Sequence, residues 1–406
     1  MGSKSDNMDE ERIKRIEEGF AGAFGTGAGG AEPVYMVSAP GRVEILGNHT
    51  DHQRGLVISG AINLDTLGAV SRNNLNQARL YSEGYNPCMV HLSDLLPDKS
   101  AFGSTRSLVR GVAEGFALRG FKVGGFDAYV ASDVPKGLGL SSSASFEAWI
   151  AAAINLLYCD GGVDPVEIAK ICRYAENAHF GKPSGLQDQM ACSIGGVLFI
   201  DFEDKEAPRY EKLGNILPGY AVCVVESGAD HAGLTEHYSA ITRDLHQISS
   251  LFGAEDLRHV DETDFIGRMP ELRKKVGDRA LLRAIHIYNE NRRVLAGKEA
   301  LERGDTETFL RQVRESGKSS FMYLQNVIVS GETRHQDLAV ALAIADELLG
   351  DAGAFRLQGG GFAGTVEAFV PEDLLPRFIS GMDNMLGRPA CMTLSFRSKG
   401  AGPVNR

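Results

Sequence analysis

The side chains most suited to chemistry gather between Ser38 and Gly55, where the chain reads SAPGRVEILGNHTDHQRG. Arg42, Asn48, His49 and Asp51 follow one another closely there, between two apolar runs that are typical of strands. Hydrogen-bond donors and acceptors at this density, beside a core, could bind a small polyhydroxylated molecule. The alternative is an ordinary polar surface turn, and this segment alone does not decide between the two.

A second candidate, VPKGLGLSSSA, stands between a predicted strand at 126–131 and a predicted helix at 143–158. Glycines and serines before a helix can direct backbone N–H groups and the positive end of the helix dipole toward a di- or triphosphate. A helix cap is the alternative, because serines are good capping residues, but Gly137 and Gly139 favour phosphate. The candidate phosphate-binding residues are Lys136, Gly137, Leu138, Gly139, Leu140, Ser141, Ser142, Ser143 and Ala144.

Two carboxylates form the third candidate. Glu176 lies near the end of a predicted helix at 165–180, and Asp188 is expected in a glycine-flanked loop ahead of an apolar run at 197–200. From different elements they could approach a shared metal ion or substrate, and a magnesium–nucleotide site often uses only one or two carboxylates plus phosphates. The alternative is a pair of solvated acids, which is the usual state of a carboxylate.

Other motifs match known patterns by letters alone. The run at 317–319 resembles the end of a P-loop but lies inside a helical pattern, and the G-x-G-x-x-G run at 359–364 is followed by a predicted strand where a dinucleotide site needs a helix. His49 and His52 have no further Cys or His at a matching spacing for a metal site. We therefore expect neither a P-loop, nor a Rossmann motif, nor a histidine metal centre.

Length, composition and charge limit the classes of protein to which the chain can belong. A chain of 406 residues with 43% hydrophobic residues favours two domains, and a net charge of −11 argues against nucleic-acid or membrane partners. The six cysteines include no C-x-x-C pair, which fits a reducing compartment. No apolar run reaches membrane-spanning length, and the first residues lack a secretory pattern, so we expect a cytoplasmic protein.

The elements that must position these side chains alternate along the chain. Predicted strands at 34–39, 56–62, 66–71, 77–81 and 126–131 are mixed with predicted helices at 108–120, 143–158 and 165–180. A predicted strand at 220–226 precedes predicted helices at 237–252, 279–303, 305–324 and 335–349 and strands at 354–358, 365–370 and 392–395. Charge, proline and glycine around 202–219 predict a domain boundary, with a partly flexible extension at 1–32 and domains at 33–205 and 206–406.

Taken together, the motifs resemble the GHMP small-molecule kinases and, within them, the galactokinases. GRVEILGNHTDHQRG is similar to the galactokinase signature, GLGLSSSAS to the phosphate loop of the family, and RLQGGGFAGTVEAFV from Arg356 to its third glycine-rich motif. Similarity extends to the run at 185–189, to His231 with Tyr238, and to the helix that carries Glu290 and Arg292. The closing SFRSKGAG also matches, so the resemblance covers residues 33–402.

The resemblance implies a mixed α/β (α+β) fold of two domains, with the active site in the cleft between them. It implies ATP-dependent phosphorylation of the C1 hydroxyl of a hexose, foremost D-galactose, with residues 136–144 binding ATP. It makes Asp188 and Arg42 the catalytic pair, and Ser142 and Glu176 the ligands of a Mg²⁺ ion. The sugar contacts that it implies are Asn48, His49, Asp51, Gly185 and Tyr238. Oligomeric state is left open.

The chain departs from the galactokinase signature at two positions. Asn48 stands where the signature has glutamate, and His52 stands where it has tyrosine. By resemblance that glutamate faces the C6 end of the sugar, so its loss removes a like-charge repulsion of several kcal/mol against a uronic acid. Galacturonate is therefore the alternative substrate, and a sugar sensor without phosphoryl transfer is the alternative of another class. Because the catalytic pair and the phosphate loop are intact, we favour the galactose kinase.

Overall fold

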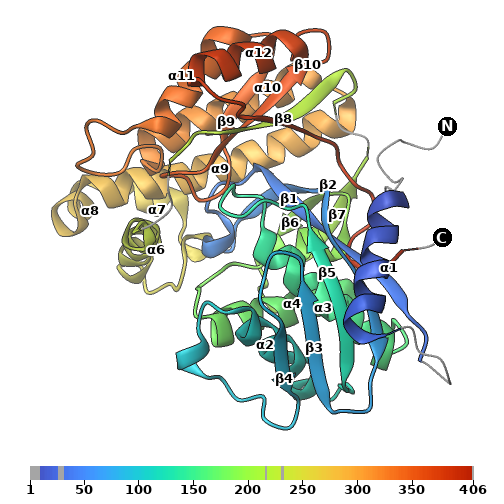
Figure 1. The fold of residues 1–406 in the computed structure, drawn as a ribbon. Coiled ribbons are helices and arrows are strands. Elements are labelled where there is room, and N and C mark those ends of the chain that lie inside the picture. The colour runs from blue at the N-terminus through green and yellow to red at the C-terminus, as the bar shows by residue number, and fades with distance from the viewer. Residues whose placement is uncertain (1–9, 26–31, 215–216, 230–232, 405–406) are drawn as a thin grey trace.

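The structure is a computed structural model that describes residues 10–25, 32–214, 217–229 and 233–404. His231, part of the resemblance noted above, lies outside these residues. Helices and strands are mixed throughout, in two sheets with helices packed around them, so the predicted mixed α/β class is confirmed (Figure 1). Among the residues described, no helix is long and apolar enough to span a membrane.

The first sheet contains eight strands, six of them in the order β12-β1-β2-β5-β3-β4, while β6 pairs with β2 and β7 with β6. Their bounds are Tyr35–Leu46 (β1), Leu56–Arg72 (β2), Gln77–Ser82 (β3), Cys88–His91 (β4), Phe126–Ser132 (β5), Val197–Asp201 (β6), Arg209–Leu213 (β7) and Gly402–Pro403 (β12). The strands predicted at 56–62 and 66–71 are one strand, β2. Asn63 stays extended because its backbone and side chain both bond with Ser395.

The two faces of this sheet carry different helices because side chains alternate along a strand. On β2, Leu67 and Ala69 pack on the N-terminal helix α1 (Glu10–Phe24), whereas Val70 packs with the helix that follows the phosphate loop, α3 (Ser142–Tyr158). The predicted extension at 1–32 therefore contains a helix that is packed on the sheet (Figure 1).

Three more helices, α2 (Thr105–Leu118), α4 (Pro165–Tyr174) and α5 (Gln187–Ile194), pack with α3. The side chain of Asp164 accepts a hydrogen bond from the Val166 amide, so Asp164 is the N-cap of α4. The helix predicted to run to Phe180 changes to a π-helical turn at Ala175–Phe180. Such turns are rare and frequent at functional sites, and this one carries Glu176.

The second sheet is antiparallel, in the order β11-β8-β10-β9. Its strands are Tyr220–Glu226 (β8), Ala354–Leu357 (β9), Thr365–Pro371 (β10) and Cys391–Leu394 (β11). One face packs on α11 (Asp337–Leu349) and α12 (Leu375–Leu386). The other packs with α9 (Asp278–Arg303) and α10 (Thr306–Ser319) in a core that also contains Val43 and Ile45 of β1. This shared core joins the two sheets.

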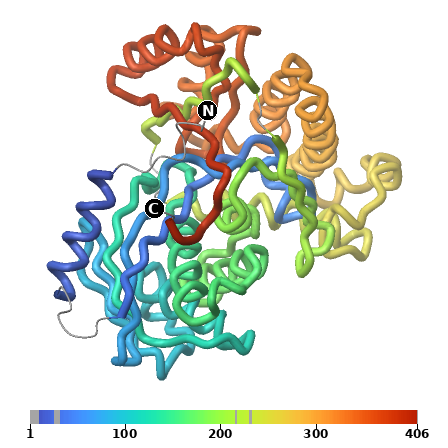
Figure 2. Tube along the Cα trace, turned by 90° about the vertical axis from the view of Figure 1, so that its right-hand side faces the viewer, coloured from blue at the N-terminus to red at the C-terminus, as the bar shows by residue number. Residues whose placement is uncertain are grey.

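Three further helices, α6 (Thr235–Ser250), α7 (Glu262–Gly267) and α8 (Met269–Val276), form a separate apolar cluster with α9. The last strand returns to the first sheet, where β12 pairs with β1 next to the region of the N-terminal helix (Figure 2). Both described ends of the chain therefore lie against the first sheet.

Several elements differ from the sequence-based expectation. Pro40 and Gly41 lie inside β1, beyond the strand predicted at 34–39, and the pairing with β2 shifts register between Pro40 and Arg42. Strand β7 lies beyond the boundary predicted at 205/206 and still pairs with β6 of the first sheet. The elements β4, β7, α5, α7, α8 and α12 were not predicted, because they are short or are interrupted by glycine or proline.

Candidate active site

Arg42 and Asp188 meet at the centre of the site. Arg42 lies on β1 and is 6% exposed, and its Nε and Nη2 atoms lie 2.8 Å and 2.7 Å from Oδ1 of Asp188. Asp188 is in the first turn of α5, which corrects the loop predicted there. The segment is helical because Leu186 and Met190, four residues apart, both enter an apolar cluster. The side chain of Asp188 keeps about 30% exposure, so it can reach a ligand.

The charges of this pair stabilise each other. Burial tends to raise the pKa of Asp188, but Arg42, the Ser141 hydroxyl and Lys182 outweigh it and hold the pKa below its usual value. Burial likewise opposes the charge of Arg42, and Asp188 and Glu44 overcome this and raise its pKa. The Ser141 hydroxyl donates to Oδ2 of Asp188 over 2.5 Å. Asp188 is therefore an ionised carboxylate at neutral pH, beside a permanent cation.

The predicted phosphate loop connects β5 to α3, as expected. Its carbonyl groups are bonded within the protein. The Leu138 carbonyl accepts from the Thr365 hydroxyl, and the Leu140 carbonyl accepts from the Arg42 amide. The Gly139 carbonyl accepts from the side chains of Arg42 and Gln358. Among the described residues, no acceptor is bonded to the amides of residues 136–144. Unbonded amides at a helix N-terminus are suited to an anion.

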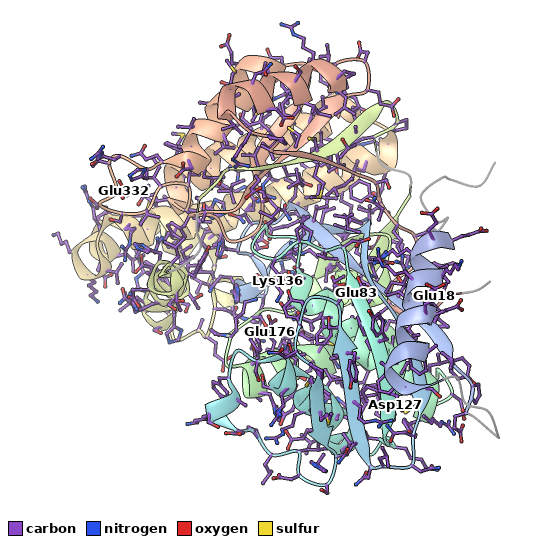
Figure 3. The ribbon with its side chains drawn as sticks, in the orientation of Figure 1. Glu18, Glu83, Asp127, Lys136, Glu176 and Glu332 are labelled. Carbon is purple, nitrogen blue, oxygen red and sulfur yellow. The ribbon has the colours of Figure 1, made fainter. Side chains whose placement is uncertain are left out.

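Several loop residues adopt conformations that suit this geometry. Gly137, Gly139 and Ser141 have φ angles of 76°, 70° and 60°, in the left-handed region that favours glycine. Lys136 is exposed and its ammonium lies 4.1 Å from the centre of the Tyr85 ring. Figure 3 shows Lys136 and Glu176 in the lower half of the molecule, below the second sheet.

Hard oxygen ligands are present where a Mg²⁺ ion was predicted. The Ser143 hydroxyl donates to Oε1 of Glu176 over 3.0 Å, and Lys182 Nζ lies 2.8 Å from the same oxygen. The structure thus brings Ser143, rather than the predicted Ser142, to Glu176, because Ser143 lies one residue further round the first turn of α3. Within the described ranges no cluster of three or more His, Cys, Asp or Glu side chains could hold a metal ion. A hydroxyl and a carboxylate fit a Mg²⁺ ion that also binds substrate phosphates.

Gln189 lies between Glu176 and a second buried acid, Glu147. Gln189 donates to Oε2 of Glu176 over 2.7 Å and lies 3.3 Å from Oε2 of Glu147. Burial, and then the charge of Glu176, raise the pKa of Glu147 well above its ordinary value. Gln189 thus connects Glu147 to Glu176, whose other oxygen faces Ser143 and Lys182.

Most of the predicted sugar contacts surround the loop after β1. Asp51 lies against Gly185, where an added Cβ atom would be 1.9 Å from Oδ2 of Asp51. Nε2 of His49 lies 3.0 Å from the carbonyl oxygen of Gly360. Burial is the main cause that lowers the pKa of His49 to about 4, so its neutral ring donates to that carbonyl. The Tyr238 hydroxyl donates to the Gly361 carbonyl over 2.9 Å, and burial raises the pKa of Tyr238 to about 12.

Asn48 is buried, whereas the other predicted sugar contacts are only partly buried. Its predicted role as a sugar contact does not fit the structure. The side chain is fully buried, and its Nδ2 donates to Oε1 of Glu44 over 2.8 Å and to the Gly359 carbonyl over 2.6 Å. Its Oδ1 accepts from Ser320 and Asn326. All four hydrogen-bonding positions of the amide are used within the protein, so Asn48 binds the loop to the rest of the chain.

Several residues around the site were not predicted as functional from the sequence: Glu44, Gln358, Arg356, His286 and Glu290. Two signals could have found some of them. Glu44 is two residues from Arg42 on a strand, hence on the same face, and Gln358 lies inside the third glycine-rich motif. Nothing local to the sequence shows that α9 contacts the loop after β1.

Comparison with known proteins agrees with this arrangement. The GHMP kinases N terminal domain matches residues 107–196, and the galactokinase galactose-binding signature matches residues 20–72. The structure resembles that of Lactococcus lactis galactokinase complexed with galactose, with a TM-score of 0.84 and 21% identity over 97% of this chain and 100% of that chain. Methanococcus jannaschii mevalonate kinase shares the fold at a TM-score of 0.62 and 16% identity, over 91% of this chain and 99% of that one.

Two curated relatives are more similar in sequence. The galactokinase of Pyrococcus furiosus is 32% identical over 83% of this chain and 89% of its own length. That of Streptomyces coelicolor is 32% identical over 84% of this chain and 86% of its own length. Identity at this level over nearly the whole of each protein shows that the chain belongs to the galactokinase family of GHMP kinases.

Proposed function

We propose that this galactokinase transfers the γ-phosphoryl group of ATP to the C1 hydroxyl of galactose at the Arg42–Asp188 pair. The observation that carries the proposal is the contact of 2.7–2.8 Å between the two side chains, next to a loop whose amides are bonded to no acceptor among the described residues. An ionised carboxylate, a guanidinium and a helix N-terminus meet there, and phosphoryl transfer depends mainly on such positioning and charge.

Each residue then has a defined role. The C1 oxygen of the sugar attacks the γ-phosphorus, the bond from that phosphorus to the β–γ bridging oxygen breaks, and ADP leaves. Asp188 orients the hydroxyl and accepts its proton, while Arg42 stabilises the charge on the transferred group. The amides of residues 136–144 hold the phosphates of ATP.

Glu176 and Ser143 would hold the Mg²⁺ ion of the nucleotide, with Ser142 one residue away at the start of α3. The ion, when bound, would neutralise charge on the phosphates. Lys182 shares Oε1 of Glu176 and would have to yield part of that contact to the ion.

For the sugar, Asp51 is suited to bind vicinal hydroxyls, since a carboxylate can accept from two donors. His49, Gly185 and Tyr238 line the same region. The galacturonate alternative rested on Asn48, which is buried and fully bonded, and no finding favours it. A sensor without turnover is not favoured either, because the Arg42–Asp188 contact is intact.

The proposal is tested by Asp188→Asn. We expect kcat for galactose to fall at least about a thousandfold, which corresponds to about 4 kcal/mol of barrier, because the amide cannot accept the proton. Thermal unfolding and galactose binding by calorimetry should change little. Asp160→Asn is the matched control, since Asp160 is exposed in a left-handed turn that asparagine also tolerates. A D188N enzyme with wild-type turnover would remove Asp188 from the mechanism.

A further inference from the structure

Glu44 lies at the site without a role in the reaction described so far. It is two residues after Arg42 on β1, and no register shift separates the two, so both side chains point to the same face. Its amide donates to Oε1 of Gln358, whose own amide group reaches the Gly139 carbonyl of the phosphate loop. Glu44 therefore stands between the reacting pair and the loop that carries His49.

The two carboxylate oxygens of Glu44 have different surroundings. Oε1 accepts from Nδ2 of Asn48 over 2.8 Å and from Nη2 of Arg356 over 3.0 Å. Oε2 is bonded to no donor among the described residues, whereas both oxygens of Glu367 are sealed from solvent and unbonded. The residue as a whole is only 5% exposed. One oxygen is thus anchored, and the other is left to accept a hydrogen bond from a ligand.

The anchors fix the carboxylate of Glu44 in place. Arg356 is completely buried, and its Nη1 donates to the backbone carbonyls of Glu44 and Ile45. A guanidinium so bonded to the side chain and backbone of one residue restricts the rotamer of its carboxylate. Asn48 cannot serve instead, because all of its donors and acceptors are used.

The position along β1 indicates which part of the sugar is within reach. Two residues of a strand span about 7 Å, which is comparable with the width of a hexose ring. If Arg42 acts at C1, Glu44 is placed toward the opposite end of the sugar. We propose that Oε2 of Glu44 accepts a hydrogen bond from the C6 hydroxyl of galactose. Its charge then disfavours a C6 carboxylate, so Glu44 selects galactose over galacturonate. The inference rests on the proposed function, which places C1 at Arg42.

A different role for Glu44 is that of a buried counter-ion, which only neutralises Arg356. The two roles predict different outcomes for Glu44→Gln. A counter-ion variant loses stability and affects all sugars alike, whereas loss of a C6 contact changes the ranking of sugars that differ at C6.

The experiment measures kcat and KM of wild type and E44Q with galactose, 6-deoxygalactose and galacturonate. We expect kcat/KM for galactose to fall at least tenfold in E44Q, through KM, with kcat within about threefold of wild type. The preference for galactose over galacturonate should fall at least tenfold, and the penalty for removing the C6 hydroxyl should shrink. An unchanged preference and an unchanged 6-deoxygalactose penalty would overturn the proposal.

Two variants serve as controls. Glu44→Asp keeps the charge and should retain most of the preference for galactose. Glu367→Gln changes the other carboxylate that neighbours Arg356 across the sheet, but its oxygens are sealed from solvent, so the preference should not change. A changed preference in E367Q would also overturn the proposal, because it would assign the effect to Arg356.

The wild-type enzyme offers a test that does not depend on folding of E44Q. With 6-amino-6-deoxygalactose, which carries a cation at C6, kcat/KM should exceed that for galacturonate at least a hundredfold, and equal values would contradict an anionic group at this position. Failure of the proposed function would look different, since wild type would then turn over none of the sugars.

Discussion

At the residue scale, the site depends on side chains that other residues hold in place. Arg42 is fixed by Asp188 and the Gly139 carbonyl, and Asp188 by Arg42 and Ser141. Positioning groups in this way before the substrate binds lets them act without reorganising during the reaction. Gly185 leaves room for the Asp51 carboxylate because it has no Cβ atom.

This contact predicts the effect of Gly185→Ala. The new methyl group would lie 1.9 Å from Oδ2 of Asp51, so Asp51 must move. We expect KM for galactose to rise at least tenfold, with little change in KM for ATP, since the phosphate loop is untouched. Gly267→Ala is the matched control, because an added Cβ there meets nothing within 4 Å. Steady-state kinetics with each substrate varied in turn would check this, and an unchanged KM for galactose would contradict a sugar-binding role for Asp51.

At the element scale, α9 supports the loop that follows β1. Oε1 of Glu290 accepts from the amides of Gly47 and Asn48 over 3.1 Å and 3.3 Å and from the Ser316 hydroxyl of α10. Nε2 of His286, one turn earlier, lies 3.0 Å from the Asn48 carbonyl. A helix of the C-terminal half thus satisfies the backbone amides of Gly47 and Asn48 and the carbonyl of Asn48.

Glu290→Gln tests this support through pH. Burial opposes the charge of Glu290, but His286, Arg293 and Arg356 overcome it and lower the pKa to about 2, from an ordinary value of 4.5. A carboxylate with a lowered pKa stabilises the fold above its unfolded pKa, and this stabilisation is lost as pH falls toward the folded value. We expect E290Q to lower the free energy of unfolding by about 3 kcal/mol near neutral pH. The difference should shrink below pH 4.5.

Urea unfolding of both proteins across this pH range measures the difference directly. Glu299→Gln on the exposed side of the same helix should cost no more than about 0.5 kcal/mol, since its pair with Arg303 is at the surface. In E290Q, KM for galactose should rise more than KM for ATP. A pH-independent difference in stability would show that Glu290 does not act through its charge.

At the scale of the whole molecule, charges from the two sheets meet where the sheets share a core. Glu367 lies on β10 of the second sheet, and the charges that act on it include Arg42 and Glu44 of β1. Burial is the main cause that raises the pKa of Glu367 to about 8, and neither of its oxygens is hydrogen-bonded. Glu367 is therefore protonated in the native protein at neutral pH.

This buried acid predicts a loss of stability in alkaline solution. The native state keeps a proton that the unfolded chain releases above about pH 4.5, so stability falls as pH rises from there to about 8. Glu367→Gln removes this dependence. We expect E367Q to unfold like wild type near pH 5 but to be more stable above pH 8, by about 5 kcal/mol. Thermal unfolding at both pH values would check this, and parallel pH profiles would contradict it.

The sequence by itself determined the family and much of the local structure. The phosphate loop with the helix after it is one contiguous segment, and the signature around Arg42 is another. A contiguous motif can be recognised without knowing how the rest of the chain folds. Hydrophobic periodicity also located most of the longer helices and strands, because the buried face of each element repeats within its own sequence.

Only the tertiary structure decided which side chains face the site. The side-chain oxygen of Asn48 is bonded by Ser320 and Asn326, which lie far along the chain, whereas Oε2 of its neighbour Glu44 is bonded to no donor among the described residues. Ser143 rather than Ser142 reaches Glu176, since the rotation of α3 on the sheet sets the direction of each side chain. These outcomes depend on packing between elements distant in sequence, which a local sequence pattern does not reveal.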